Sequence, residues 1–114
     1  MNLDYIIHEL DLKPLTELQD YSQVVPSGGY ASDLLSCVMA GAPHQGIWIT
    51  LQAHANIVAV AALLELSAVI ITEGAMPDPA TIEKANREHV TLFSTSEPTY
   101  TVVGKLWTAG LLTK

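Results

Sequence analysis

The sequence has few basic residues and a single cysteine, and each scarcity excludes a class of function. Five lysines and arginines stand against twelve aspartates and glutamates, which gives a formal net charge of −7 at pH 7. Binding to nucleic acid or to an anionic membrane surface needs a surplus of positive charge, so neither partner is expected. Cys37 has no second cysteine to pair with, which excludes an internal disulfide and suits a reducing compartment. A cytoplasmic location is therefore expected.

The sequence also lacks a long hydrophobic run and a basic amino-terminal region. Residues 55–64 form an apolar stretch without charge, but it is far shorter than the roughly 18 residues that indicate a membrane-spanning helix. The first residues lack the positive charges that begin a signal peptide. A chain of 114 residues, 49% hydrophobic and 15% charged, is typical of a globular protein. We expect a single domain over residues 1–114.

Residues 46–74 carry the pattern around which the rest of the fold is predicted. Residues 47–51 are rich in β-branched and aromatic types, which favours a strand, and residues 52–56 are a polar turn. Residues 57–64 are rich in Ala and Leu and too long for one strand, which indicates a buried helix. Residues 68–72 are a continuous Val and Ile run, typical of a strand covered on both faces. This order predicts a right-handed βαβ crossover.

Helices and strands are predicted to alternate on both sides of this crossover. Asp78 followed by Pro79 is a strong helix start, Gly110 is a helix C-cap, and Ser32 or Asp33 is expected to cap a short helix. The further predicted helices span residues 3–10, 34–38, 79–89 and 97–109, and the further predicted strands span residues 15–18, 24–25 and 90–93. This alternation predicts an α/β fold, a three-layer α/β/α sandwich with a largely parallel sheet.

Four segments of the chain resemble the DRTGG domain family. They are VPSGGYASDLLS at residues 25–36, GIWITLQAHANIVAVA at 46–61, ITEG at 71–74 and VTLFSTSEPTYTVVGKLWTAGL at 90–111. The resemblance covers nearly the whole chain and implies a three-layer fold like the N-terminal domains of HPr kinase and of Mur ligases. Similar domains occur fused to CBS-pair modules and in phosphotransacetylases. The family resemblance implies a regulatory or ligand-binding role.

The sequence departs from the family motif at one place. Val25, Pro26 and Ser27 stand where the family has Asp-Arg-Thr before its two glycines, which removes the arginine that would bind an anion at this loop. Gly28 and Gly29 permit positive φ and a close approach of backbone to ligand, so they are candidates for ligand contact. The alternative is a tight turn or bulge between two strands, because the pair lacks the spacing of a dinucleotide fingerprint.

Open parallel sheets bind ligands beyond the carboxyl ends of their strands. Polar residues follow three of the predicted strands there, and backbone N–H groups at the helix starts near Asn56 and Ser96 suit a nucleotide. The alternative is that these residues are ordinary caps and turns. The candidate ligand-binding residues are Gly28, Gly29, Asp33, Gln52, His54, Asn56, Glu73, Gly74, Thr95 and Ser96.

No catalytic residue, metal site or cofactor is predicted. The four histidines do not recur at the spacing of metal ligands. Cys37 lies among apolar neighbours and is interpreted as a buried core thiol. The chain has no P-loop lysine and no kinase catalytic loop. Trp107 is interpreted as packing inward, with contact to a partner as the alternative.

The predicted function is therefore non-enzymatic. The first hypothesis is a regulatory or ligand-binding module that senses an adenine nucleotide, or a similar small ligand, as a homodimer. The alternative is a protein–protein interaction module without a small-molecule ligand, whose partner would be a regulatory protein of a redox or kinase system. A stand-alone kinase or phosphatase ranks last, because phosphoryl transfer needs Lys, Arg or metal ligands around the phosphates, and the chain offers few.

Overall fold

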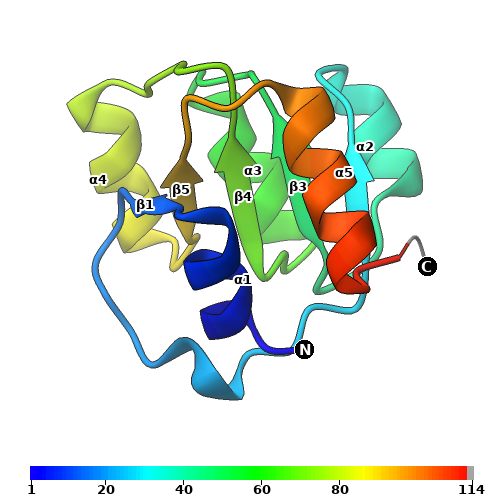
Figure 1. Cartoon of the computed structure of the whole chain (residues 1–114). Coiled ribbons are helices and arrows are strands. Elements are labelled where there is room, and N and C mark those ends of the chain that lie inside the picture. The colour runs from blue at the N-terminus through cyan, green and yellow to red at the C-terminus, as the bar shows by residue number, and fades with distance from the viewer. Residues whose placement is uncertain (113–114) are drawn as a thin grey trace.

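The computed structural model describes residues 1–112 and shows a five-stranded sheet with the strand order β1-β5-β4-β3-β2 (Figure 1). Strands β2 to β5 are parallel, and β1 pairs antiparallel with β5. The strands are β1 (Lys13–Pro14), β2 (Gly29–Ala31), β3 (Ile47–Thr50), β4 (Ala68–Ile71) and β5 (Leu92–Ser94). The helices are α1 (Leu3–Leu10), α2 (Leu35–Gly41), α3 (Asn56–Leu63), α4 (Pro79–Arg87) and α5 (Thr99–Ala109), with a short 3₁₀ helix, η1, at Tyr21–Gln23.

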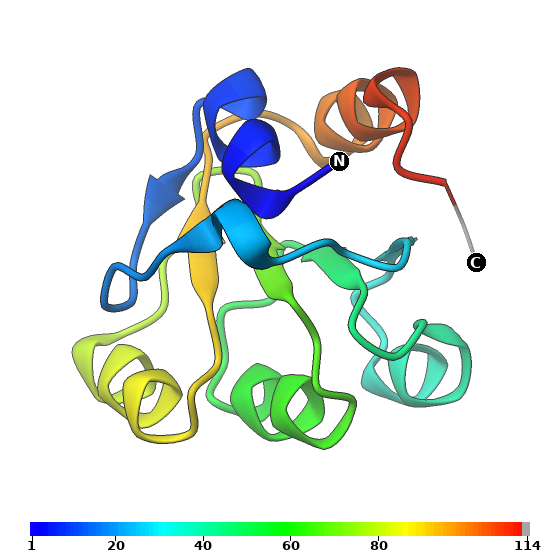
Figure 2. The ribbon, with the colours of Figure 1, turned by 90° about the horizontal axis from the view of Figure 1, so that it is seen from below.

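Helices cover both faces of the sheet. Helices α2, α3 and α4 connect successive parallel strands and lie on one face, whereas α1 and α5 lie on the other (Figure 2). After β5 the chain crosses over the carboxyl ends of the neighbouring strands before α5 begins (Figure 1). The predicted three-layer α/β/α arrangement and the predicted βαβ unit are confirmed. Among residues 1–112, no helix has the length and apolar character needed to cross a lipid bilayer.

The central strands send alternate side chains into two separate hydrophobic layers. Ile47, Ile49, Ile70 and Phe93 pack toward α1 and α5. Their neighbours along the strands pack toward α2, α3 and α4, and they include Trp48, Val69, Ile71 and Leu92. Every residue of β3 and β4 is buried, so the continuous apolar runs follow from a sheet that has no solvent-facing side.

The predicted start of α4 and the predicted end of α5 are confirmed, and both depend on residues close by in the sequence. The Asp78 side chain accepts a hydrogen bond from the Thr81 N–H at 2.8 Å, and Pro79 occupies the first turn of α4. On the same helix, Glu83 and Arg87 form an i,i+4 ion pair at 3.1 Å. Gly110 adopts a φ of 108° at the end of α5, where a left-handed residue is required.

The two outer strands lie where the sequence did not predict them. Residues 15–18 and 24–25 were predicted as strands and are not, and the edge strands are β1 and β2 instead. Gly29 is the first residue of β2, so the predicted tight turn at Gly28 and Gly29 is wrong. The glycine pair enters the sheet because the Ile47 N–H donates to the Gly28 carbonyl at 2.8 Å, a long-range pairing that local pattern does not contain.

Several predicted boundaries shift by one to three residues. The helix predicted at 79–89 ends at Arg87, the helix predicted at 97–109 begins at Thr99, and the strand predicted at 90–93 spans Leu92–Ser94. The helix predicted at 34–38 runs from Leu35 to Gly41. In α4, Thr81 and Ala85 are buried, whereas Ile82 is only half-buried.

Replacement of Asp78 is expected to destabilise the fold in a pH-dependent way. The pKa of the Asp78 carboxyl lies below its usual range, because hydrogen bonds from Thr81 stabilise the charged form and nearby His54 adds a smaller effect in the same direction. Because the pKa of Asp78 is lower in the folded protein than in the unfolded chain, its charged carboxyl stabilises the fold fully at a pH above the unfolded-state pKa. This stabilisation is lost as the pH falls through the folded-state pKa. We expect Asp78→Ala to lower the Tm at pH 7 by roughly 5 °C.

Thermal melts from pH 7 to pH 2 measure this effect. The difference in Tm between wild type and Asp78→Ala should shrink below about pH 4. Asp78→Asn is the matched control, because its side-chain oxygen can still accept the hydrogen bond from the Thr81 N–H but carries no charge. A difference in Tm that stays constant down to pH 2 would contradict the role of the charge.

Candidate functional site

The structure brings most of the predicted site residues to one edge of the sheet, where strands β2 to β5 end. We call this the carboxyl edge. Because these strands are parallel, the residues that follow each of them meet there. The carboxyl edge holds Asp33 after β2, Gln52, His54 and Asn56 after β3, Glu73 and Gly74 after β4, and Thr95 and Ser96 after β5. Gly28 and Gly29 lie at the amino end of β2 and take no part in it.

Asp33 joins the ends of two strands instead of capping a helix. Its carboxylate accepts hydrogen bonds from the Thr50 hydroxyl at 2.7 Å and from the Leu51 N–H at 2.9 Å. The Gln52 side chain donates to the Asp33 carbonyl at 3.3 Å. The predicted helix cap by Ser32 or Asp33 is therefore wrong, because α2 begins after Leu34 without a side-chain cap, although the Ser32 hydroxyl accepts from the Leu34 N–H at 3.1 Å. Asp33 and Gln52 hold the β2 and β3 ends together.

Glu73 caps α5 from a different part of the chain. One carboxylate oxygen of Glu73 accepts a hydrogen bond from the Thr99 N–H at 2.8 Å. Glu73 and Gly74 both adopt positive φ, and their N–H groups donate to the carbonyls of Glu97 and Thr95. The side chain that caps this helix therefore comes from 26 residues away in sequence. The helix terminus that was expected to receive a phosphate is occupied by a carboxylate of the protein.

His54 and Asn56 form a small exposed turn before α3. The His54 Nδ1 accepts a hydrogen bond from the Asn56 N–H at 3.1 Å, and both side chains are exposed. Thr95 likewise uses its hydroxyl locally, to accept from the Glu97 N–H at 3.1 Å. The polar side chains at the carboxyl edge therefore serve largely as caps of the protein's own backbone, which is the alternative that the sequence left open.

Negative charge dominates the carboxyl edge. Asp33, Glu73, Asp78 and Glu97 all lie in the segments that form it, and Lys105 reaches it only to pair with Glu97 at 3.4 Å. An unpaired phosphate placed there would meet like charges at short range, which raises the free energy of binding. Among residues 1–112, no group of three His, Cys, Asp or Glu side chains is arranged to hold a metal ion.

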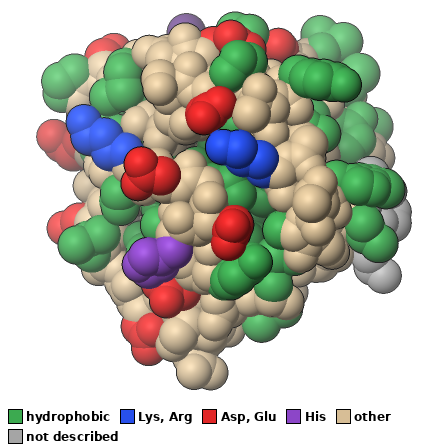
Figure 3. Space-filling model, viewed as in Figure 1, with side chains coloured by type: hydrophobic (Ala, Val, Ile, Leu, Met, Phe, Trp, Pro, Cys, Tyr) green, Lys and Arg blue, Asp and Glu red, His purple; other side chains and the backbone are tan. Residues whose placement is uncertain are grey.

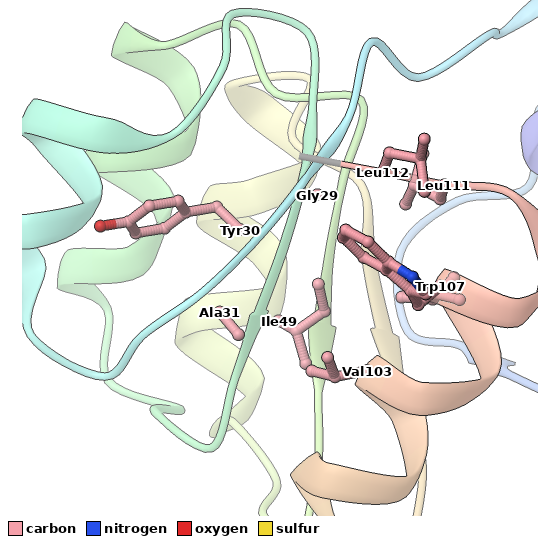
Figure 4. Close-up of a pocket in the computed structure, with 9 residues that line it drawn as sticks. Gly29, Tyr30, Ala31, Ile49, Val103, Trp107, Leu111 and Leu112 are labelled. Atoms are coloured by element: carbon pink, nitrogen blue, oxygen red, sulfur yellow. The ribbon is translucent and has the colours of Figure 1, made fainter. Parts of the chain in front are cut away.

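An apolar groove lies at the β2 edge of the sheet, beneath α5 (Figure 4). It has a volume of about 320 Å³ and is open to solvent on one side. The indole of Trp107 lies over it, and Ile49 and Val103 form its floor and wall (Figure 4). Its remaining lining comes from Gly29, Tyr30, Ala31, Leu106, Leu111 and Leu112. We call this site the β2 groove.

Small residues and a sharp turn create the β2 groove. Gly29 and Ala31 leave space on the face of β2 that points to α5. Gly110 turns the chain back after α5, so that the Leu112 carbonyl accepts from the Gly29 N–H at 3.1 Å. A Cβ at Gly29 would lie 3.3 Å from the Leu111 side chain, so glycine permits this close packing.

The side chain that marks the β2 groove was interpreted wrongly from sequence. Trp107 was expected to pack inward, but it is 55% exposed, whereas Trp48 is fully buried. The helix α5 turns only Val102 and Leu106 fully into the core. Cys37 is also exposed, not buried as predicted, because the short helix α2 fully buries only Val38. The signal available in the sequence was the pair of small residues, Gly29 and Ala31, on a strand that pairs with the buried strand β3.

Comparison with known proteins finds one matching domain family and a solved structure with a similar fold. The family model of the DRTGG domain matches residues 37–109. Among solved structures, the chain resembles the CBS and DRTGG domains of the regulatory region of Clostridium perfringens pyrophosphatase, crystallised with the activator diadenosine tetraphosphate. The TM-score is 0.75 at 21% identity, and the match covers 98% of this chain and 50% of that chain, so this chain spans about half of its length. No curated protein matches the chain.

Removal of the Glu73 carboxylate is expected to open an anion site at the start of α5. Glu73→Ala frees the Thr99 N–H and should lower the Tm by roughly 5 °C, as loss of a helix cap does. Inorganic phosphate should then raise the Tm of the variant more than that of wild type, because the freed N–H groups attract an anion. Thermal melts in phosphate and in chloride at equal ionic strength measure the difference.

Glu97→Ala is the matched control for this experiment. It removes a carboxylate from the same edge but leaves the Thr99 N–H bonded to Glu73. Its response to phosphate should stay below that of Glu73→Ala, because the Thr99 N–H keeps its bond to Glu73. Equal phosphate responses in all three proteins would show that Glu73 does not occupy an anion position.

Proposed function

The chain belongs to the DRTGG domain family, and from this premise we propose that it is a non-catalytic regulatory module that binds an adenine-containing ligand and works as a homodimer. Support for the ligand class comes from the structurally similar regulatory region, which was crystallised with diadenosine tetraphosphate. Support for a non-catalytic role comes from the carboxyl edge, where the polar side chains are used as caps. The β2 groove is the proposed binding site.

The exposed Trp107 at the mouth of the β2 groove is the observation that carries the proposal. The half-exposed indole of Trp107 borders the apolar cavity, and a purine ring stacks on indole with about 1–3 kcal/mol of binding free energy per base. The volume of about 320 Å³ is near the lower end of ligand pockets, which run from roughly 300 to 1,000 Å³. The groove therefore suits one base, with ribose and phosphates outside it.

The charge of the protein determines which nucleotide it would favour. A net charge of −7 repels additional phosphates over a distance of about one Debye length, roughly 8 Å at physiological salt. AMP should therefore bind more tightly than free ATP. Magnesium should reduce this difference, because it neutralises part of the triphosphate charge.

A second function is favoured by a different feature. The segments around β2 expose apolar side chains and carry little charge, which suits contact with another protein. In this alternative the chain is an interaction module and binds no small molecule. A ligand screen separates the two proposals.

A thermal-shift screen with AMP, ADP, ATP and diadenosine polyphosphates, with and without magnesium, tests the ligand proposal. A specific ligand raises the Tm in proportion to the logarithm of its concentration above Kd. Trp107→Ala should weaken binding about tenfold or more, since the stacking surface is lost. Quenching of Trp107 fluorescence should report binding directly, because Trp48 is buried and unaffected.

Tyr100→Ala is the matched control, because Tyr100 is an aromatic residue on the same helix, 90% exposed and outside the β2 groove. It should bind the ligand as wild type does. An equal loss of affinity in both variants would move the site away from the β2 groove. A flat response of wild type to every nucleotide would favour the interaction module.

A further inference from the structure

A second groove lies between helices α1 and α5, on the side of α5 away from β2. It has a volume of about 760 Å³, more than twice that of the β2 groove, and it is open to solvent. We call it the α1–α5 groove. The described chain leaves α5 on the other side, where the Leu112 carbonyl accepts from the Gly29 N–H (Figure 1). Its lining includes Tyr5 and Glu9 from α1, and Tyr100, Gly104 and Lys105 from α5.

Two exposed tyrosines stand toward opposite ends of the α1–α5 groove. A Cβ at Gly110 would lie 3.3 Å from the Met1 side chain, so α1 begins beside the end of α5 and the two helices run in opposite directions (Figure 1). Tyr5 therefore lies toward the end of α5, whereas Tyr100 lies in its first turn. Tyr100 is 90% exposed and Tyr5 is 48% exposed. Neither ring belongs to the two hydrophobic layers, so both can contact a molecule outside the chain.

Gly104 lies in the middle of α5, between the positions of the two tyrosines. Glycine in a helix interior destabilises the helix relative to alanine, so it needs a reason. Gly41 and Gly46 are explained by close packing, because a Cβ at either would lie within 3 Å of other atoms, and Gly74 and Gly110 adopt positive φ. A Cβ at Gly104 would have no such neighbour within 4 Å, so packing within the protein does not require glycine there. The absent side chain instead keeps the helix surface clear inside the groove.

Acidic side chains are widely spread over the face of the molecule that α1 and α5 cover (Figure 3). Residues 1–12 contain three acidic side chains and no Lys or Arg, and the charge of Lys105 is balanced by Glu97 at 3.4 Å. The Glu9 carboxylate lines the groove, and its negative charge raises the pKa of the Tyr5 hydroxyl. Within residues 1–112, Glu9 has no ion-pair partner. The groove therefore attracts a cationic partner and repels an anionic one.

We propose that the α1–α5 groove binds an extended, arginine-containing segment of a partner protein. A guanidinium group stacks on an aromatic ring and pairs with a carboxylate, and Tyr5 and Glu9 offer both on one helix. The groove follows α5 from Tyr100 to Thr108, a rise of about 12 Å. An extended chain covers about 3.3 Å per residue, so roughly four residues of the partner would span it. The absent Cβ of Gly104 lets the partner lie close to the helix.

The α1–α5 groove is separate from the β2 groove, so peptide binding is tested independently of nucleotide binding. Isothermal titration of the full chain uses short capped peptides of sequence Gly-X-Pro-X-Pro-Gly, in which X is arginine, lysine, citrulline or glutamate. Proline keeps the probe extended, and citrulline has the shape of arginine without its charge. The arginine peptide should bind with a Kd below about 1 mM and about tenfold more tightly than the citrulline peptide. The lysine peptide should bind more weakly than the arginine peptide, and the glutamate peptide should not bind.

Gly104→Leu separates a binding role from a structural one, because its two expected effects have opposite signs. Leucine favours a helix and its side chain would enter open space, so the Tm should rise by roughly 3 °C. The same side chain fills the groove, so the arginine peptide should bind about tenfold more weakly. Ala59→Leu is the matched control, because Ala59 is exposed on α3, on the opposite face of the sheet (Figure 2). It should leave the peptide Kd within about twofold of wild type.

Glu9→Gln tests the charge that selects arginine. It keeps the size of the side chain and should reduce the preference for the arginine peptide over the citrulline peptide to about twofold or less. Glu88→Gln is the matched control, because Glu88 is an exposed acid at the end of α4, and the preference should persist. Tyr100→Ala should weaken the arginine peptide about fivefold, because a stacking surface is lost.

Three outcomes would overturn the arginine-binding role of the α1–α5 groove. The first is no binding of the arginine and lysine peptides at about 1 mM, and the second is binding that Gly104→Leu and Glu9→Gln leave unchanged. The third is a wild-type dimer in sedimentation equilibrium that Gly104→Leu converts to a monomer, since a second copy would then occupy the groove. Nucleotide binding at the β2 groove is judged by Trp107→Ala, so the two sites can fail separately.

Discussion

The burial of β3 and β4 on both faces is the constraint on which the rest of this structure depends. A parallel sheet whose central residues are all buried and nearly all apolar cannot leave either face in water, so two helical layers are required. Helices α2, α3 and α4 cover one face as crossover connections. The other face has no such connections, and it is covered by the two ends of the chain, α1 and α5. The long crossover from β5 to α5 follows from this need.

That crossover explains the character of the carboxyl edge. The segment after β5 must pass over the end of β4 to reach the opposite face, and its carbonyls accept hydrogen bonds from Glu73 and Gly74 on the way. Glu73 then caps α5. Polar residues at this position in an open sheet usually indicate a ligand site. Here the same residues satisfy the backbone groups that the crossover leaves without partners, and the apolar groove lies instead at the β2 edge.

The features that the sequence predicted are those decided by neighbouring residues. The βαβ unit, α1 and the Asp78 cap of α4 each depend on a pattern within about ten residues, and all three are confirmed. The short strands β1 and β2 were not predicted, because two or three residues become a strand only through a partner far away in sequence. For the same reason the Glu73 cap was not foreseen, although the placement of the polar residues at one edge was. The exposure of Trp107 depends on Gly29, Ala31 and Gly110 together, so helical periodicity alone did not reveal the β2 groove.

Charge distribution links the candidate functions to one side of the molecule. The acidic residues lie largely outside residues 21–43, and that uncharged segment builds β2 and α2. A strongly negative protein can associate with itself, or hold an anionic nucleotide, only where its own charges are remote. The β2 side meets this condition and the carboxyl edge does not. The β2 groove, lined by Gly29, Ala31 and Trp107, lies on this side.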